Sequence, residues 1–472
     1  MAVQKKHAKG SVRPASPGGR FTDARVPDPA IRSLFDEKNR WQRWLDVEAA
    51  LAAAEADVGV VPRKAAKAIA QAASMKRLDA DRIRAGIAAT SHPLMALITE
   101  LSNEVGEPHG GWVHWGATTQ NIIQTGFVLV LREVHTRLLD LLGQVFAALG
   151  DLADRGAYMA CAGRTHGQHA VPITFGLKAA AWIDELSRHA DRLGEVEKRV
   201  FTALMGGAVG NFESFGGKGI AIQAGVARRL GLLPMAVPLR SISDSFAEYT
   251  CILGLLAATG GKIAAEIYTL MKTEYGEAGE PLPEGTIGSS TMPHKRNPQL
   301  AQDCMTISAQ IRALAPLAME GMMHDHEVNG ANFEMTLDAV ERSCILTGDM
   351  LARLNIILSG LELNPQRMRA NLDLTGGLIT SEAVMLELGQ SIGRQEAHDV
   401  VYKAAQTAAR GKMTFSEALC ADPHVTSHLD RAAIKRLLDP STKTGLSVSL
   451  SRTGARRARK LAGLLTSPKR RS

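Results

Sequence analysis

The chain has 472 residues, of which 45% are hydrophobic and only 4% aromatic, and its formal net charge is +7. This length predicts several domains with a sizeable core. With so few aromatic rings for base stacking, the positive charge does not indicate nucleic-acid binding. No apolar run approaches the roughly 18 residues that span a membrane.

The start of the chain and the cysteines indicate the cell compartment. Residues 1–20 are basic, rich in Gly, Pro and Ser, and lack the apolar core of a signal peptide, which predicts a disordered basic tail. The five cysteines are widely spaced and form no Cys-x-x-Cys pair, which argues against a disulfide scaffold and for a reducing compartment. We therefore expect a cytoplasmic protein.

Long helices dominate the rest of the chain. Apolar residues recur at helical spacing over five segments: 39–59, 122–156, 174–204, 245–274 and 298–323. A helix of about 30 residues is about 45 Å long, so its apolar face must be buried against other helices or a second subunit. The pattern predicts an all-α fold with a central bundle. The expected domains are an N-terminal helical domain at 21–112, the long-helix bundle at 113–363 and a C-terminal helical cap at 364–472.

Connectors between these segments hold the residues that can do chemistry. They are rich in Gly, Pro and His and lie at 91–95, 109–121, 161–174, 206–219 and 281–298. Loops held by rigid helices are where functional residues concentrate. Their histidines can transfer protons near neutral pH, although a single histidine is more often structural. The pair in "HDHE" (324–327) points to different faces of a helix, so we predict no metal site.

The loop "GTIGSSTMPHKRNPQL" (285–300) indicates acid–base chemistry on an anion. Its glycines free backbone N–H groups, and Lys295 adds a positive charge, so both can stabilise a negatively charged intermediate. The hydroxyl of Ser289 or Ser290, or a histidine, can move a proton. The glycines and the nearby prolines also suit a mobile lid. We therefore take residues 281–298 as a catalytic loop.

Three motifs resemble those of one enzyme family. "GSSTMPHKRNP" (288–298) resembles the signature of the fumarase/aspartase superfamily, and residues 112–125 and 161–180 resemble its other two conserved regions in the expected order. "WVHWGAT" and residues 368–385 are most similar to the 3-carboxy-cis,cis-muconate cycloisomerase branch, followed by adenylosuccinate lyase. The resemblance covers residues 25–455. It implies a three-domain all-α homotetramer, active sites shared between three subunits, a small dicarboxylate substrate and no metal or organic cofactor.

The resemblance also implies residue roles. Ser289 is the base that removes the proton beside the substrate carboxylate, and Lys295 and Asn297 support the loop and the developing negative charge. His166 is the expected general acid for the leaving group. The expected substrate-binding residues are His92, His114, Thr118, Thr119, Gln168, Arg240 and Ser290.

Departures from the family pattern bear on the reaction. His166 and Gly167 stand where the cycloisomerases have Trp-Leu, which favours elimination. Val328 and Met335 stand where adenylosuccinate lyases have arginines, which disfavours a nucleotide phosphate.

Further departures change the charges of two other motifs. Asn121 and Gln124 replace two carboxylates, Ser243 replaces an arginine, and Arg240 appears just upstream of it. These changes favour a more anionic or differently shaped leaving group.

The leading interpretation is a cofactor-independent carbon–nitrogen lyase. It would release fumarate from an N-substituted aspartate or a related succinyl compound that is not a nucleotide. The alternatives are a 3-carboxy-cis,cis-muconate cycloisomerase, adenylosuccinate lyase itself and a catalytically silent helical scaffold.

Overall fold

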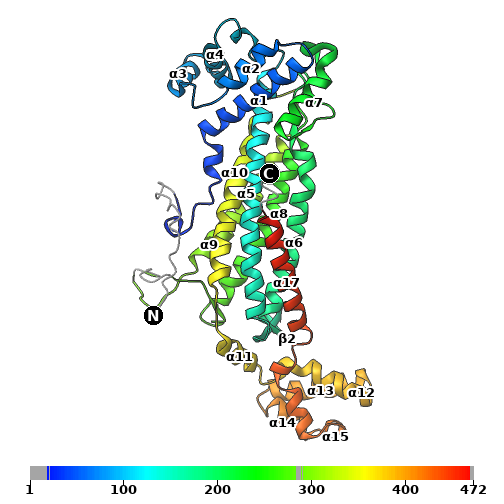
Figure 1. Cartoon of the computed structure of the whole chain (residues 1–472). Coiled ribbons are helices and arrows are strands. Elements are labelled where there is room, and N and C mark those ends of the chain that lie inside the picture. Colours follow the sequence, from blue (N-terminus) through cyan, green and yellow to red (C-terminus); the bar gives the residue numbers. More distant parts are fainter. Residues whose placement is uncertain (1–18, 21, 283–288, 290, 468–472) are drawn as a thin grey trace, which may run out of the picture.

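The computed structural model describes residues 19–20, 22–282, 289 and 291–467. Its centre is a bundle of long helices lying side by side (Figure 1). These helices are α5 (Thr119–Arg155), α6 (Phe175–Val200), α8 (Asp244–Leu270), α9 (Gln299–Glu320) and α10 (Gly330–Gly360). The first four coincide within a few residues with predicted segments, and α1 (Glu37–Asp57) matches the fifth. The predicted all-α fold is confirmed, while α10 was missed.

One end of the bundle carries the N-terminal elements. They are η1 (Asp23–Arg25), η2 (Arg32–Phe35), α1, α2 (Arg63–Ala72), α3 (Ala80–Thr90), α4 (Pro93–Val105) and η3 (Gly110–Trp112). A later segment, η4 (Glu213–Lys218) with α7 (Gly219–Leu230), lies at the same end (Figure 1). A Cβ on Gly225 of α7 would come 2.9 Å from Ala54 of α1, so glycine allows this close packing.

The opposite end carries the C-terminal elements, which have a hydrophobic core of their own that includes Val384, Leu388 and Phe415. The elements are α11 (Pro365–Asp373), η5 (Leu378–Thr380), α12 (Ser381–Ile392), α13 (Arg394–Ala409), α14 (Phe415–Ala421), α15 (Pro423–Thr426), α16 (Arg431–Leu437) and η6 (Pro440–Thr442). The last helix, α17 (Ser447–Leu465), turns back along α5 and α6 (Figure 1). Its Ala455 and Ala458 belong to the main core.

Three short two-stranded sheets join the helices. β1 (Ala160–Thr165) and β2 (Gln168–Thr174) form an antiparallel hairpin, with Thr165 opposite Gln168. β3 (Thr202–Ala203) pairs in parallel with β4 (Leu233–Pro234), and β5 (Ala278–Gly279) pairs antiparallel with β6 (Glu362–Leu363). The connector predicted at 161–174 is therefore a hairpin, and β5 leads into the loop 281–298.

Helix α8 is apolar and long enough to cross a membrane, but 61% of its most apolar window is buried inside the protein. It packs against α6, α9 and α10. Within the described residues, α8 is a core helix of the bundle.

A buried arginine on α10 ties the N-terminal segment to the bundle. Arg353 is 1% exposed and forms ion pairs with Asp23 and with Asp303, the latter at 3.4 Å. Its Nη2 also donates to Thr22 Oγ1 at 3.0 Å. A buried charge is tolerated only when it is paired in this way.

Replacing Arg353 with alanine should destabilise the protein by about 3 kcal/mol, because it leaves Asp23 and Asp303 without their buried cation. Thermal unfolding followed by circular dichroism measures the change. Arg342→Ala is the matched control, because its i,i+4 pair with Asp338 on the same helix is about half exposed and such pairs contribute little. Equal melting temperatures for the two variants would contradict this role for Arg353.

Candidate active site

The predicted site residues fall into two groups at opposite ends of the bundle. The first group surrounds the start of α5. His92 caps α4, where its Nδ1 accepts a hydrogen bond from the Met95 N–H at 3.2 Å. This leaves His92 Nε2 3.5 Å from Thr119 Oγ1, the first residue of α5. Thr118 precedes it and donates its N–H to Asn121 Oδ1 at 3.1 Å. The free N–H groups of a helix start make such a place suitable for a carboxylate.

Arg240 also reaches the start of α5. Its Nε donates to Gln120 Oε1 at 2.8 Å, its Nη1 donates to the carbonyl of Ala208 at 3.0 Å, and Gln120 Nε2 donates back to the Arg240 carbonyl at 3.1 Å. Partial burial lowers the pKa of the Arg240 guanidinium from its ordinary value, but an arginine remains charged at neutral pH. The hydrogen bonds hold this cation at Gln120, the residue that follows Thr119.

His114 belongs to the same end of the molecule. It lies between η3 and α5, and its Nδ1 is 2.6 Å from Oε1 of Glu48 on α1. The imidazole is 15% exposed and the carboxylate 1% exposed. No motif singles out Glu48, because an acid in a long helix is usually on its surface.

The second group begins with the β1–β2 hairpin at the other end. His166 and Gly167 form its turn, with φ angles of 52° and 77°, and both are exposed together with Gln168. A two-residue hairpin turn with both φ angles positive matches the twist of the strands, and glycine suits the second position. The turn therefore presents the His166 imidazole to solvent at the tip of a short sheet.

A buried ion pair fixes this hairpin to the base of the loop 281–298. Arg164 Nη2 lies 2.5 Å from Glu277 Oε1, and the guanidinium stacks 4.9 Å from the ring centroid of Tyr275. Glu277 is fully buried and also accepts a hydrogen bond from Asn371 Nδ2 at 2.7 Å. The hairpin and the start of the loop are thus parts of one rigid unit.

The described part of the loop 281–298 places Ser289 in a turn of its own. Its Oγ accepts hydrogen bonds from the N–H groups of Thr291 at 3.4 Å and Met292 at 3.1 Å. Lys295 is exposed and Asn297 is half-buried, with its carbonyl accepting from the Gln299 N–H at 2.9 Å. Ser290 and residues 283–288 lie outside the described residues.

Both ends of this loop are anchored. The carboxylate of Glu280 accepts the N–H groups of Leu300 at 3.1 Å and Ala301 at 2.5 Å, at the start of α9. Burial raises the pKa of Glu280, and these two hydrogen bonds oppose the rise. Arg296 pairs with Glu362 of β6 at 2.9 Å. The loop therefore begins and ends on fixed points.

The two groups are separated by the length of α5. This helix has 37 residues, which corresponds to about 55 Å. Thr119 is its first residue, whereas the hairpin with His166 follows its last turn (Figure 1). One chain therefore gathers His92, His114 and Arg240 at one end, and His166 with Ser289 at the other.

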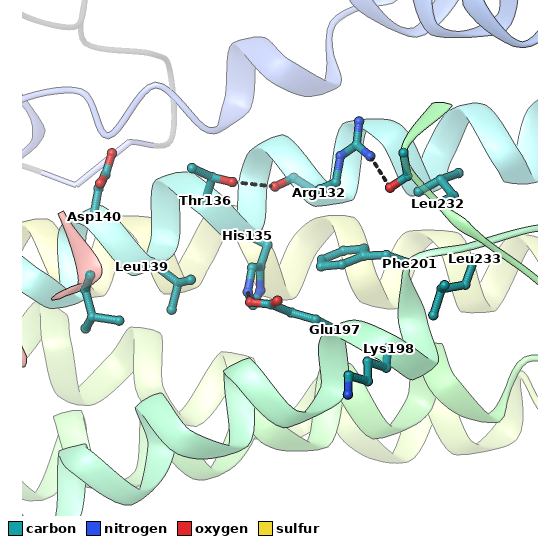
Figure 2. A pocket seen from close by; sticks show the side chains of 12 residues that line it. Arg132, His135, Thr136, Leu139, Asp140, Glu197, Lys198, Phe201, Leu232 and Leu233 are labelled. Atoms are coloured by element: carbon teal, nitrogen blue, oxygen red, sulfur yellow. Dashed lines mark hydrogen bonds and ion pairs between the residues drawn. The ribbon is translucent and has the colours of Figure 1, made fainter. Parts of the chain in front are cut away.

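A side cavity of about 320 Å³ lies between α5 and α6 (Figure 2). Buried His135 lies on its wall, with Nδ1 3.1 Å from the Tyr249 hydroxyl and Nε2 3.2 Å from Glu197. Arg132 donates to the carbonyls of Leu230 and Gly231. Within the described chain, none of the predicted site residues lines this cavity.

Two family models, several relatives and solved structures match most of the chain. The family described as "Lyase" matches residues 19–313, and "Adenylosuccinate lyase C-terminus" matches residues 377–452. N-acetyl-S-(2-succino)cysteine lyase of Enterococcus italicus is 38% identical over 88% of this chain and 91% of that protein. Adenylosuccinate lyase of Pyrococcus horikoshii is 37% identical over 88% of this chain and 92% of that protein. The crystal structure of 3-carboxy-cis,cis-muconate lactonizing enzyme from Pseudomonas putida has a TM-score of 0.84 at 33% identity, covering 93% of this chain and 99% of that chain.

Proposed function

Because this chain belongs to the fumarase/aspartase superfamily of lyases, we propose that it releases fumarate from a succinyl compound without a cofactor. The substrate is an N-substituted aspartate or a related succinyl compound such as a succinylated thiol. The names of two relatives support this choice, since one refers to a succinylated cysteine and the other to a succinylated nucleotide. The observation that carries the proposal is the gathering of His92, Thr119 and Arg240 at the start of α5.

The proposed elimination has one base and one acid. Ser289 Oγ, in its alkoxide form, removes a proton from the carbon next to a substrate carboxylate, which becomes a doubly charged aci-carboxylate. Lys295 and Asn297 stabilise this charge. The electron pair then forms the C=C bond of fumarate as the bond to nitrogen or sulfur breaks, and His166 protonates the leaving group. The backbone N–H groups that face Ser289 Oγ favour its charged form.

Completing this site requires more than one copy of the chain. The β1–β2 hairpin with the acid follows the last turn of α5, a helix of 37 residues and about 55 Å, so further copies of the chain must supply the missing parts, and the family resemblance implies three subunits for each site. Exposed apolar residues on the bundle support such an assembly, with Leu255 of α8 49% exposed and Met305 of α9 37% exposed. We propose a cytoplasmic homotetramer in which subunits share each active site.

Arg240 should bind an anionic group on the leaving side of the substrate. For such a substrate, Arg240→Ala should raise KM by about 10- to 100-fold with little change in kcat, because a hydrogen bond to a charged group contributes about 1.5–3 kcal/mol. Steady-state kinetics with substrates that carry neutral and anionic leaving groups measure the effect. Arg228→Ala on α7 is the control, because that arginine is largely exposed. An unchanged KM for the anionic substrate would remove Arg240 from the site.

A second candidate function is the cycloisomerisation of 3-carboxymuconate. The structural similarity to the lactonizing enzyme supports it. The two reactions are related, because cycloisomerisation adds an internal carboxylate to a C=C bond, whereas the lyase reaction forms a C=C bond as the leaving group departs. His166 in the hairpin turn favours elimination over this reaction. Adenylosuccinate lyase activity is disfavoured by Val328 and Met335, which stand where that branch has arginines.

The test runs the elimination backwards. Purified protein is mixed with fumarate and, in turn, ammonia, aspartate, other amino acids, diamines and cysteine derivatives, and the loss of fumarate is followed by ultraviolet absorbance. Consumption with one partner names the leaving group. Turnover of 3-carboxymuconate without consumption of fumarate by any partner would favour the second candidate instead.

A further inference from the structure

The side cavity between α5 and α6 is a feature that the proposed reaction does not use (Figure 2). Its volume of about 320 Å³ falls within the range of roughly 300–1,000 Å³ that small-molecule sites occupy. Cavities that stay empty in proteins are apolar, whereas charged and apolar side chains both line this one. The cavity therefore has the composition of a binding site for a small molecule.

One part of the cavity wall is apolar. Leu139 of α5, Phe201 at the end of α6, Leu232 before β4 and Leu465 in the last turn of α17 are all buried. Leu233 of β4 is 48% exposed, so this side of the cavity reaches solvent. An apolar group that enters here leaves water and gains contacts with these side chains.

Arg132 of α5 brings a positive charge to the cavity. Its Nη1 donates to the carbonyls of Leu230 at 2.7 Å and Gly231 at 2.8 Å, which fixes the guanidinium. Among the residues that the structure describes, Arg132 forms no ion pair, and its Nε and Nη2 donate no hydrogen bond. This edge of a guanidinium is the one that binds a carboxylate through two parallel hydrogen bonds. An anionic group of a ligand would compensate the charge of this half-buried arginine.

Glu197 of α6 brings a negative charge to the facing wall (Figure 2). Its Oε1 is 3.2 Å from Nε2 of buried His135, which lies one turn after Arg132 on the same face of α5. Nδ1 of His135 is 3.1 Å from the Tyr249 hydroxyl. Both ring nitrogens thus have partners inside the protein, and His135 fixes the Glu197 carboxylate. A cation and an anion therefore face one cavity from neighbouring turns.

Two further charged residues line the cavity. Lys198 is exposed next to Glu197 and forms no ion pair within the described chain. Asp140 of α5 is buried. Apart from His135, the lining thus combines two basic and two acidic side chains. This balance disfavours a ligand with a single charge and favours one that carries a positive and a negative group.

We propose that this cavity binds an α-amino acid with an apolar side chain, at a site separate from the proposed active site. The carboxylate of the amino acid binds the Nε and Nη2 edge of Arg132, and its ammonium group binds Glu197. Its side chain lies against the buried leucines and Phe201. The inference does not depend on the proposed function, because the described residues assigned to the elimination do not line the cavity.

The test is isothermal titration calorimetry of the full-length protein with L-leucine, L-methionine and L-phenylalanine in turn. At least one should bind saturably, with one molecule per chain. Two analogues of the amino acid that binds then separate its charges, because its amide lacks the carboxylate and its deaminated acid lacks the ammonium group. Each analogue should bind about 10- to 100-fold more weakly, as expected for the loss of a hydrogen bond to a charged group. No binding of any of the three amino acids, or equal binding of both analogues, would overturn the inference.

Variants of the cavity wall test the assignment of the two charged contacts. Arg132→Gln and Glu197→Gln should each weaken binding by about tenfold or more. The matched control is Arg137→Gln, because Arg137 is also half-buried on α5 and donates to a backbone carbonyl, that of Pro29, at 2.8 Å, but does not line the cavity. Its binding should equal that of the wild type. Leu233→Trp narrows the cavity from its exposed side and should also weaken binding, so the test does not depend on Arg132→Gln remaining folded.

One more variant distinguishes the cavity from the proposed active site. The proposed reaction can release an amino acid, so binding at the start of α5 must be told apart from binding in the cavity. Arg240→Ala should keep wild-type affinity for the amino acid. Loss of binding in Arg240→Ala, together with wild-type binding in Arg132→Gln and Glu197→Gln, would place the amino acid at the start of α5 and overturn the inference. Turnover of succinyl compounds is measured separately, so a failure of the proposed function is recognised on its own.

Discussion

Replacing Ser289 with alanine is expected to lower kcat by about 10²- to 10⁴-fold with little change in KM, the loss typical of a positioned general base. The Ser289 Oγ accepts hydrogen bonds from the N–H groups of Thr291 and Met292. These donors stabilise negative charge on the oxygen, as a base that works as an alkoxide requires. Steady-state kinetics with the substrate identified by the fumarate assay measure the change.

The neighbouring hydroxyl provides the control for this variant. Thr291→Ala removes an exposed side chain of the same loop and keeps the backbone N–H that faces Ser289, so its kcat should stay close to that of the wild type. Melting temperatures should be unchanged in both variants, because neither side chain is part of the core. A Ser289→Ala enzyme with more than about a tenth of wild-type activity would mean that another group is the base.

The long helices could be predicted because their apolar periodicity is unbroken. Helix α10 was missed because its inner face carries polar residues, among them Ser343, Thr347, Asp349 and Arg353, all of them buried. Arg353 is compensated by Thr22 and Asp23, more than 300 residues earlier in the chain. A sequence pattern cannot show a contact between such distant residues. The polar residues therefore hide the apolar periodicity by which α10 could have been predicted as a core helix.

The residues of the proposed site could be named from motifs, but their arrangement in one chain could not. The motif resemblance placed a base, an acid and a carboxylate site on separate connectors, and the structure shows that one chain holds them at two ends. Glu48 could not be singled out from the sequence because acids in an alanine-rich helix are ordinarily solvated. The position of Glu48 seven residues after Trp41 and three after Leu45 was the signal that it lies on the buried face.

Two inactive variants are expected to restore activity when they are combined in one assembly. His166→Ala removes the proposed acid at the hairpin end, and the double variant Thr119→Ala with Arg240→Ala disables the binding group at the start of α5. At substrate concentrations well below the wild-type KM, each homo-oligomer should be nearly inactive. If each site takes its hairpin and its α5 start from different copies, a mixed assembly contains native sites. With equal amounts of the two chains, about one site in four should be native, because each copy contributes independently.

Co-expression with two different affinity tags isolates the mixed assemblies, and kcat/KM per site measures the recovery. The control combines His92→Ala with the same double variant. His92 and Thr119 lie within 3.5 Å in one chain, so every site then receives a defective α5 start and activity should not return. Recovery in the mixture with His166→Ala and none in the mixture with His92→Ala would show that the sites are shared between subunits. It would also show that mixing does not restore activity by a general stabilising effect. Equal activity in both mixtures would mean that each site is built within one chain. The 37 residues of α5 argue against this, because they separate the two groups of site residues within one chain.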